Sequence, residues 1–169
     1  MEAETPTPPA LAKTYAAAEF KLIRLRELPW PDKILDTPDR AFDFWEQHIA
    51  TANWYRFDNE CFCTLFLNTR RVVKGFNMCS MGTLDSLLVH PRDVFRAAIS
   101  HGAAAIVLAH NHPSGDPTPS EGDIKVTRDL IRAGQLLKIE VLDHVIIGRA
   151  TEQRPRGCCS LRELGYFYS

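Results

Sequence analysis

The sequence predicts an α/β fold, in which a mixed β-sheet is flanked by helices. Short apolar segments, typical of buried strands, alternate along the chain with longer amphipathic segments, typical of helices. The chain has 169 residues, of which 45% are hydrophobic, so it is long enough to bury one core but too short for two full domains. No internal repeat is visible in it.

The N-terminal residues differ from the rest, and we divide the chain into an extension at residues 1–33 and one domain at residues 34–169. The start of the extension is acidic and rich in Pro and Thr, and we expect it to be disordered. It lacks the basic start and the apolar stretch of a signal peptide. Further along, Phe20–Leu28 alternates in a way that fits a strand, and Pro29 and Pro31 then break regular structure.

Several amphipathic segments carry the signals of helices. The first begins after Thr37, a predicted N-cap, with Pro38 in the first helical position. The second opens at Pro91, the third covers Glu121–Leu137, and a short closing helix is expected at Ser160–Tyr168. The residues expected to face the core are Ala41, Phe42, Phe44, Trp45 and Ile49 in the first helix, Val94, Phe95, Ala97, Ala98 and Ile99 in the second, and Ile124, Thr127, Leu130, Ile131, Gly134 and Leu137 in the third.

Within residues 34–169, four segments are predicted to be strands. They are Phe62–Leu67, Val72–Met78, Ala103–Ala109 and Ile139–Ile147, and a polar loop is expected at Arg149–Gly157. Nearly continuous apolar runs such as the first and third are typical of strands that are covered on both faces. The alternation of these strands with helices therefore predicts a sheet with helices on both sides.

The composition excludes several classes of protein. Lys and Arg total 20 and Asp and Glu total 21, so the formal net charge of -1 lacks the basic excess of a general DNA coat protein. No apolar run approaches the length needed to cross a bilayer, and we expect no membrane partner. The five cysteines lack the spacing of a disulfide framework, which predicts reduced thiols and a cytoplasmic protein. Cys61 and Cys63 alternate inside an apolar run and are interpreted as buried strand thiols rather than metal ligands.

The most informative segment runs from His110 to Asp123. His110 and His112 lie two residues apart at the end of an apolar strand, so both imidazoles can share one face. Asp123 follows in the first turn of the next helix. Two imidazole nitrogens and one carboxylate oxygen are a common zinc ligand set, and they leave the fourth position for a water, as in catalytic sites. Glu60, at the entry of a buried strand, is the best candidate for a proton shuttle that is not itself a ligand.

These residues also have structural interpretations, which the residue pattern leaves open. Ser120 and Asp123 fit a helix capping box without any chemistry, and Glu60 fits a solvated charge at the start of a strand. Asp143 and His144, neighbours on a predicted strand, are interpreted as a structural pair. The other histidines are assigned to the surface, in the case of His48 and His101, and to the start of a helix, in the case of His90.

The spacing of these residues resembles a known metal signature. The pattern His110-x-His112-Pro113, followed by Ser120 and Asp123, is similar to the JAMM (MPN+) signature His-x-His-Pro-x6-to-7-Ser-x-x-Asp. The longer string HNHPSGDPTPS, with GTLDSLLVHPRD before it and LDHVIIG after it, resembles the RadC-like branch of that family, from roughly residue 34 to the end. A mild departure is an Asp at the end of VHPRD, where the family has Glu. RadC-like proteins often carry an N-terminal helix-hairpin-helix domain, for which residues 1–33 are too short.

This resemblance implies a JAB1/MPN fold, a cytidine-deaminase-like α/β sandwich, with one Zn²⁺ per chain. His110, His112 and Asp123 would be the metal ligands, Glu60 the general acid/base, and Ser120 a support for the oxyanion of the tetrahedral intermediate. Family members of known activity cleave peptide or isopeptide bonds. The resemblance thus implies a zinc-dependent hydrolase that cleaves an amide bond of a protein or peptide substrate through a metal-activated water.

Two further interpretations remain open at this point. The family label suggests a DNA-associated module in DNA repair or recombination, and four arginines near the C-terminus would form a weak basic patch: Arg149, Arg154, Arg156 and Arg162. An inactive scaffold is a third alternative, against which the intact ligand set argues. A homo-oligomer could form through Arg70, Arg71 and the strand at Val72–Met78, if that strand lies at the edge of the sheet.

Overall fold

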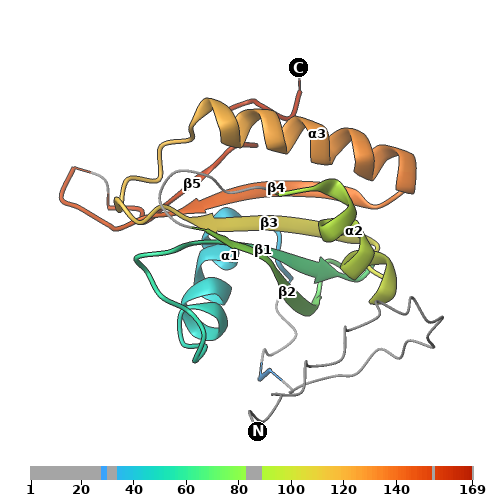
Figure 1. Cartoon of the computed structure of the whole chain (residues 1–169), viewed down its shortest axis with the longest axis horizontal. Helices are drawn as coiled ribbons and strands as arrows, with labels where there is room; N and C mark the ends of the chain where they lie inside the picture. The colour runs from blue at the N-terminus through green and yellow to red at the C-terminus, as the bar shows by residue number, and fades with distance from the viewer. Residues whose placement is uncertain (1–27, 30–33, 83–88, 154, 169) are drawn as a thin grey trace, which may run out of the picture.

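A computed structural model of the chain describes residues 28–29, 34–82, 89–153 and 155–168. Its centre is one sheet with the strand order β2-β1-β3-β4-β5 (Figure 1). The strands are β1 at Glu60–Leu67, β2 at Val73–Gly82, β3 at Ala105–Asn111, β4 at Glu140–Ile147 and β5 at Cys158–Ser160. The sheet is mixed, because β3 and β4 are parallel while every other neighbouring pair is antiparallel. The predicted α/β class is confirmed, and the architecture is consistent with the JAB/MPN type.

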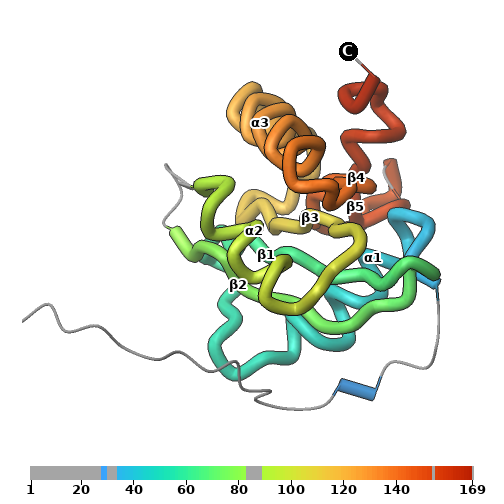
Figure 2. The backbone as a smooth tube through the Cα atoms, turned by 90° about the vertical axis from the view of Figure 1, so that its right-hand side faces the viewer, coloured from blue at the N-terminus to red at the C-terminus, as the bar shows by residue number. Residues whose placement is uncertain are grey.

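Helices cover both faces of this sheet. Helix α1, Pro38–Phe44, continues into a π-helical turn, η1, at Trp45–Ile49, and both lie against one face. Helices α2, Pro91–Ser100, and α3, Glu121–Leu137, lie on the other face (Figure 2). The expected start of the first helix is confirmed, since the Thr37 hydroxyl accepts a hydrogen bond from the backbone N–H of Arg40 at 3.3 Å.

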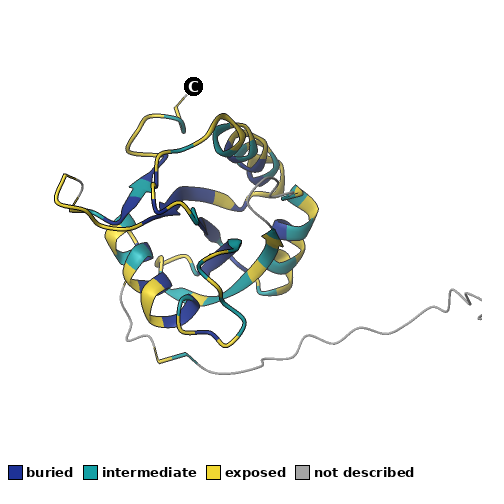
Figure 3. Ribbon diagram, turned by 60° about the vertical axis from the view of Figure 1, so that its left-hand side comes forward, coloured by how far each residue is buried: buried dark blue, intermediate teal, exposed yellow. Residues whose placement is uncertain are grey.

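Alternation along the central strands divides the core into two clusters. In β1, Cys61, Cys63, Leu65 and Leu67 face α1, while Phe62 and Phe66 face α2 and α3. All of these side chains are buried, as the dark strands inside the lighter helices of Figure 3 illustrate. Since both faces of β1 are covered, the strand reads in the sequence as a continuous apolar run. The two cysteines are therefore core thiols, as predicted.

Close packing of α3 on the sheet brings the start of that helix to the end of β3. Gly134 permits the approach, because a Cβ at this position would lie only 2.5 Å from the Ile139 carbonyl oxygen. The parallel strands β3 and β4 are joined through α3, the usual crossover for a parallel pair. Gly134 faces the core, as the sequence predicts.

The expected closing helix at Ser160–Tyr168 is wrong. Ser160 ends β5, which pairs with β4, and the chain after it runs through turns. The Ser160 hydroxyl hydrogen-bonds the Asp143 carboxylate at 2.7 and 2.9 Å, and Gly165 has a φ of +88°, which a helix does not allow. A long-range contact to β4 thus outweighs the local helical pattern.

Smaller corrections concern single side chains. Ile99 and Leu137 are 56% and 44% exposed, because each lies near the C-terminal end of its helix, beyond the part that packs on the sheet. His48 is only 7% exposed, contrary to the surface position expected for it, because its ring packs against Phe44. His101 is half-buried and stacks on Phe66.

Two segments discussed in the sequence analysis lie wholly or partly outside the residues that the structure describes. Most of the strand expected at Phe20–Leu28 lies outside them, as do residues 83–88 of the GTLDSLLVHPRD string. Among the residues that the structure describes, no helix combines the length and apolarity required to cross a bilayer.

Candidate metal centre

The register of two central strands brings the predicted site residues together at one end of the sheet. Strand β1 runs antiparallel to β3, with Phe62 paired to His110. Glu60 stands two residues before Phe62 and therefore lies on the same face of the sheet as His110, next to the chain that continues to His112. Asp123 arrives from the first turn of α3, which covers this face.

The four side chains form one compact cluster. One possible ligand atom from each of Glu60, His110, His112 and Asp123 lies within 4.8 Å of all the others. His110 Nε2 lies 3.0 Å from His112 Nε2, 3.2 Å from Asp123 Oδ1 and 3.8 Å from Glu60 Oε1. His112 Nε2 lies 3.4 Å from Asp123 Oδ2.

These separations fit a tetrahedral metal ion. Zinc bonds of about 2.0–2.1 Å in tetrahedral geometry place neighbouring ligand atoms about 3.3 Å apart. The distances from His110 Nε2 to His112 Nε2 and to Asp123 Oδ1, 3.0 and 3.2 Å, fit that spacing, and the other Asp123 oxygen, Oδ2, lies 3.4 Å from His112 Nε2. The Glu60 carboxylate stands farther back. The donor set suits zinc or another divalent cation of similar preference, with Glu60 close enough to act on a group held in the fourth position.

Asp123 is held by the capping box at the start of α3. Its Oδ2 accepts hydrogen bonds from the backbone N–H of Ser120 and from the Ser120 hydroxyl, both at 2.7 Å. The Ser120 oxygen accepts in turn from the Asp123 backbone N–H at 3.1 Å. The structural interpretation of this pair is therefore confirmed, and it does not compete with the metal site, because Asp123 Oδ1 still faces His110.

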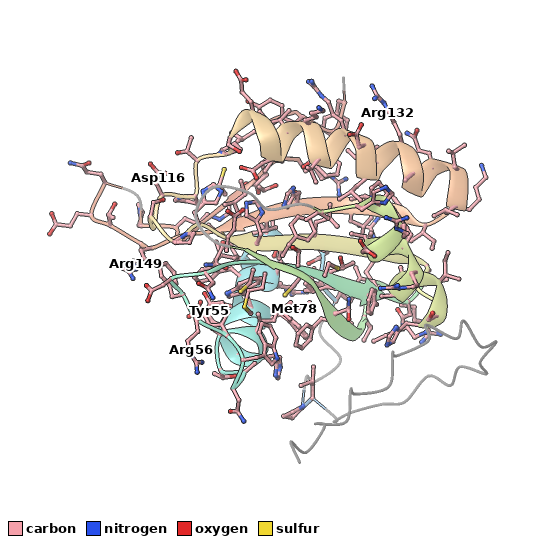
Figure 4. All side chains as sticks on the ribbon, viewed as in Figure 1. Tyr55, Arg56, Met78, Asp116, Arg132 and Arg149 are labelled. Atoms are coloured by element: carbon pink, nitrogen blue, oxygen red, sulfur yellow. The ribbon has the colours of Figure 1, made fainter. Side chains whose placement is uncertain are left out.

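His112 is fixed by a rigid loop between β3 and α3. Its Nδ1 lies 2.7 Å from the backbone oxygen of Asp116, and its backbone N–H donates to Ile147 at 2.8 Å. Gly148 allows this loop to lie against the end of β4, because a Cβ there would come within 2.5 Å of the Gly115 carbonyl oxygen. Figure 4 places the loop residue Asp116 and the β4-side residue Arg149 at the same end of the molecule.

Asn111 holds the segment that presents Glu60, a role that the sequence analysis missed. It lies between the two histidines and points to the opposite face of the sheet, where it is fully buried. Its oxygen accepts from the Cys61 N–H at 2.9 Å, and its amide donates to the carbonyls of Phe57 and Asn59 at 3.1 and 3.0 Å. Only its place in an alternating strand end signals this role in the sequence.

His144 lies directly behind His110, so Asp143 and His144 are linked through the His144 backbone N–H, which donates to the Asp143 carboxylate at 2.7 Å, and not through their two side chains. His144 Nε2 lies 2.8 Å from His110 Nδ1, on the α3 side of the sheet. The Asp143 carboxylate instead binds Ser160 and the backbone N–H of Arg162, on the side of β5. Neighbouring residues of a strand point to opposite faces, which separates these two side chains.

Burial and hydrogen bonding compete in setting the charge of the cluster. Burial alone would raise the pKa of Asp123, but the His110 and His112 imidazoles that face it outweigh burial and hold this pKa well below its usual range. Burial likewise lowers the pKa of His112, but its bonds to Asp123 and to the Asp116 carbonyl reverse the shift and raise it. The result is an ionised carboxylate facing imidazoles, which suits a cation.

The cysteines stay apart from this cluster. None of the five forms a disulfide, and burial raises the pKa of the Cys61 and Cys63 thiols, and that of Cys158 to about 11. Thiols of this kind are protonated at neutral pH and make poor ligands.

The basic patch that would favour DNA binding is largely engaged within the molecule. Arg156 contacts the carboxylates of Asp39 and Glu163 at 2.7 and 2.6 Å. Arg162 donates to Tyr168 and to the Leu142 carbonyl, both at 3.2 Å. The Arg149 guanidinium stacks over Phe57, 4.3 Å from the ring centroid, and the fourth predicted arginine, Arg154, lies outside the described residues. No observation on the described residues favours a DNA-binding patch.

Comparison with known proteins gives a consistent result. A family model described as RadC-like JAB domain matches residues 35–166. A UPF0758 protein of Moorella thermoacetica is 60% identical over 91 residues, which cover 54% of this chain and 40% of that protein. A UPF0758 protein of Symbiobacterium thermophilum is 40% identical over 157 residues, covering 93% of this chain and 62% of that protein. The chain thus spans roughly half the length of these relatives.

Proposed function

This chain belongs to the family of RadC-like JAB domains, and from that premise we propose that it is a zinc-dependent hydrolase that cleaves amide bonds in a peptide or protein. The observation that carries the proposal is the cluster of His110, His112 and Asp123, spaced for one ion, with Glu60 set back from it. A divalent cation held there would act as a Lewis acid and lower the pKa of a bound water to about 7.

Each side chain then has a distinct task. His110, His112 and Asp123 hold the cation from one side, and their hydrogen bonds to β4, the loop and α3 keep them in place. Glu60 takes the proton of the attacking water and returns it to the leaving nitrogen, for which its position beside His110 and its partial exposure are suited. Supporting the oxyanion, the task assigned to Ser120, requires its hydroxyl to turn away from Asp123.

The roles of ligand and proton shuttle are separated by two substitutions. Glu60→Gln should retain one zinc per chain, measured by elemental analysis, and lose at least about 100-fold in turnover, since general acid/base groups contribute about 10²–10⁴-fold. His110→Ala should lose the zinc itself, because it removes one of three ligands. Turnover is assayed on a panel of fluorogenic peptide amides and lysine-linked isopeptides, with a chelator-treated sample as the control.

Two outcomes would contradict this proposal. Loss of zinc from Glu60→Gln would make Glu60 a ligand and overturn its role as the shuttle. Purified protein that takes up no zinc, or that cleaves no amide in the panel with zinc bound, would remove the assignment as an amide hydrolase.

A further inference from the structure

Behind His110, a series of buried hydrogen bonds runs from the candidate metal site through β4 to α3. His144 Nε2 lies 2.8 Å from His110 Nδ1, and His144 Nδ1 lies 2.6 Å from the Thr127 hydroxyl oxygen. The Thr127 hydroxyl in turn donates to the backbone oxygen of Asp123 at 2.6 Å. His110, Thr127 and His144 are all fully buried, so no water competes for these bonds.

The protons available to these hydrogen bonds allow one consistent assignment of donors and acceptors. Thr127 has a single hydroxyl proton, and the bond to the Asp123 carbonyl uses it, so Thr127 must accept from His144 Nδ1. A neutral imidazole carries one N–H, so His144 Nε2 must then be an acceptor, and His110 Nδ1 must donate to it. The free lone pair of His110 is thereby placed on Nε2, the atom that faces His112 and Asp123.

The neutral state of His144 follows from its surroundings. His144 is fully buried, and a charged ring there would lose its hydration. Its ring contacts an imidazole, a hydroxyl and the edge of the Phe62 ring, and none of these is a carboxylate. A protonated His144 would donate from Nε2 and force the proton of His110 onto the atom that must bind the metal.

We propose that His144 and Thr127 are positioning residues that fix the tautomer and the ring orientation of His110 for metal binding. The proposal rests on the metal-dependent function stated above. It also explains how His110 and Asp123 keep their spacing, because Thr127 joins the ring system behind one to the backbone of the other. A metal-binding histidine usually donates to a carboxylate, a carbonyl or water, as His112 does to Asp116, whereas His110 donates to a second imidazole.

The first test separates the Thr127 hydroxyl from the volume of its side chain. Thr127→Val keeps the shape and removes the hydroxyl, while Thr127→Ser keeps the hydroxyl. Zinc affinity is measured by competition with a chromophoric chelator. We expect Thr127→Val to bind zinc about 10–100-fold more weakly and Thr127→Ser to stay within about threefold of the natural protein, in line with outer contacts of other metal sites.

Thr64 provides the matched control. It is likewise a fully buried threonine, and its hydroxyl contacts the Cys79 sulfur at 3.2 Å rather than any residue of the metal cluster. Thr64→Val should leave zinc affinity unchanged. Equal zinc affinity in Thr127→Val and Thr127→Ser would overturn the proposal, and so would an equal loss in Thr127→Val and Thr64→Val.

The second test reads the tautomers directly and does not depend on activity. In protein labelled with ¹⁵N-histidine at pH 8, long-range ¹H–¹⁵N spectra should show both His110 and His144 protonated on Nδ1, with and without zinc. A proton on His110 Nε2 in the zinc-free protein would overturn the proposal. Because the zinc-free spectrum tests the hydrogen bonds alone, a protein that binds no zinc would refute the proposed function without deciding this result.

Discussion

Asp143 and His144 are adjacent buried polar residues of β4, yet they belong to different parts of the molecule. Asp143 faces β5, where its carboxylate accepts from the Ser160 hydroxyl and from the backbone N–H groups of Arg162 and His144. His144 faces α3, where its ring bonds only side chains, those of His110 and Thr127. Two adjacent buried polar residues of one strand can thus have different roles. Their hydrogen-bond partners, and not their place in the sequence, show which role each has.

A cavity of the molecule and the candidate metal site lie on different faces of the sheet. A cavity of about 290 Å³ lies on the Asp143 side, lined among others by Leu35, Val107, Val145 and Tyr168. The cluster of metal-ligating side chains lies on the other face. An ion needs converging donors rather than a large volume, so the candidate metal site lies at the cluster and not in the cavity.

The largest effect in this comparison is expected on the stability of the Asp143 side. Asp143→Ala leaves the Ser160 hydroxyl and two backbone N–H groups without their acceptor. At about 1–3 kcal/mol for each unsatisfied buried group, partly relieved by water, we expect a loss of about 3 kcal/mol in the free energy of unfolding. Urea unfolding of zinc-free protein measures it. Zinc affinity should stay the same. Weaker zinc binding in this variant would contradict the assignment of Asp143 to stability rather than to the metal site.

The opposite pattern is expected for His144→Leu. Leucine fills the buried space but offers no acceptor for His110 Nδ1, so zinc affinity should fall about 10–100-fold. The free energy of unfolding should fall by less than in Asp143→Ala, because one buried donor rather than three is left unsatisfied. The same chelator competition and urea unfolding serve here, and a larger stability loss than in Asp143→Ala would contradict the assignment.

The smallest effect concerns pH. Burial raises the pKa of the Asp143 carboxyl, although the bonds from Ser160, Arg162 and His144 act against the shift. A raised pKa in the folded state means that the folded protein binds the proton more tightly than the unfolded chain, whose Asp pKa is about 3.9. The corresponding stability is fully present below that value and is lost as pH rises through the folded pKa.

The natural protein should therefore gain stability relative to Asp143→Asn as pH falls from 7 towards 4. Comparing the two proteins by urea unfolding at each pH cancels the titration of every other group. A difference that is constant over this range, or one that shrinks as pH falls, would show that the carboxyl has no raised pKa.

The metal cluster was more predictable from the sequence than the residues that support it. His110 and His112 share a strand face, and Asp123 follows at a fixed distance in a capped helix, so local rules place all three. Glu60 was predicted by its place at a strand entry, and the pairing of Phe62 with His110 brings it to the cluster.

The supporting contacts depend on pairings between distant segments, which local patterns do not contain. His144 reaches His110 because β4 lies parallel to β3, and Asn111 reaches Cys61 across 50 residues of sequence. The closing helix was predicted wrongly for the same reason. Ser160 belongs to β5, which pairs with β4, and its hydroxyl donates to the Asp143 carboxylate. The helix starts at Thr37 and Ser120, which rest on neighbouring residues alone, were predicted correctly.

The register of β1 decides which chemistry the end of the sheet presents. A slip of one residue against β3 would turn every side chain of β1 to the opposite face and bring the Cys61 thiol to the place of Glu60. A sulfur there would bring a fourth protein ligand to the candidate metal site, and four protein ligands are typical of closed, structural zinc sites. The bond from the Cys61 N–H to Asn111 opposes that slip, so this amide keeps a carboxylate rather than a thiol beside the two histidines.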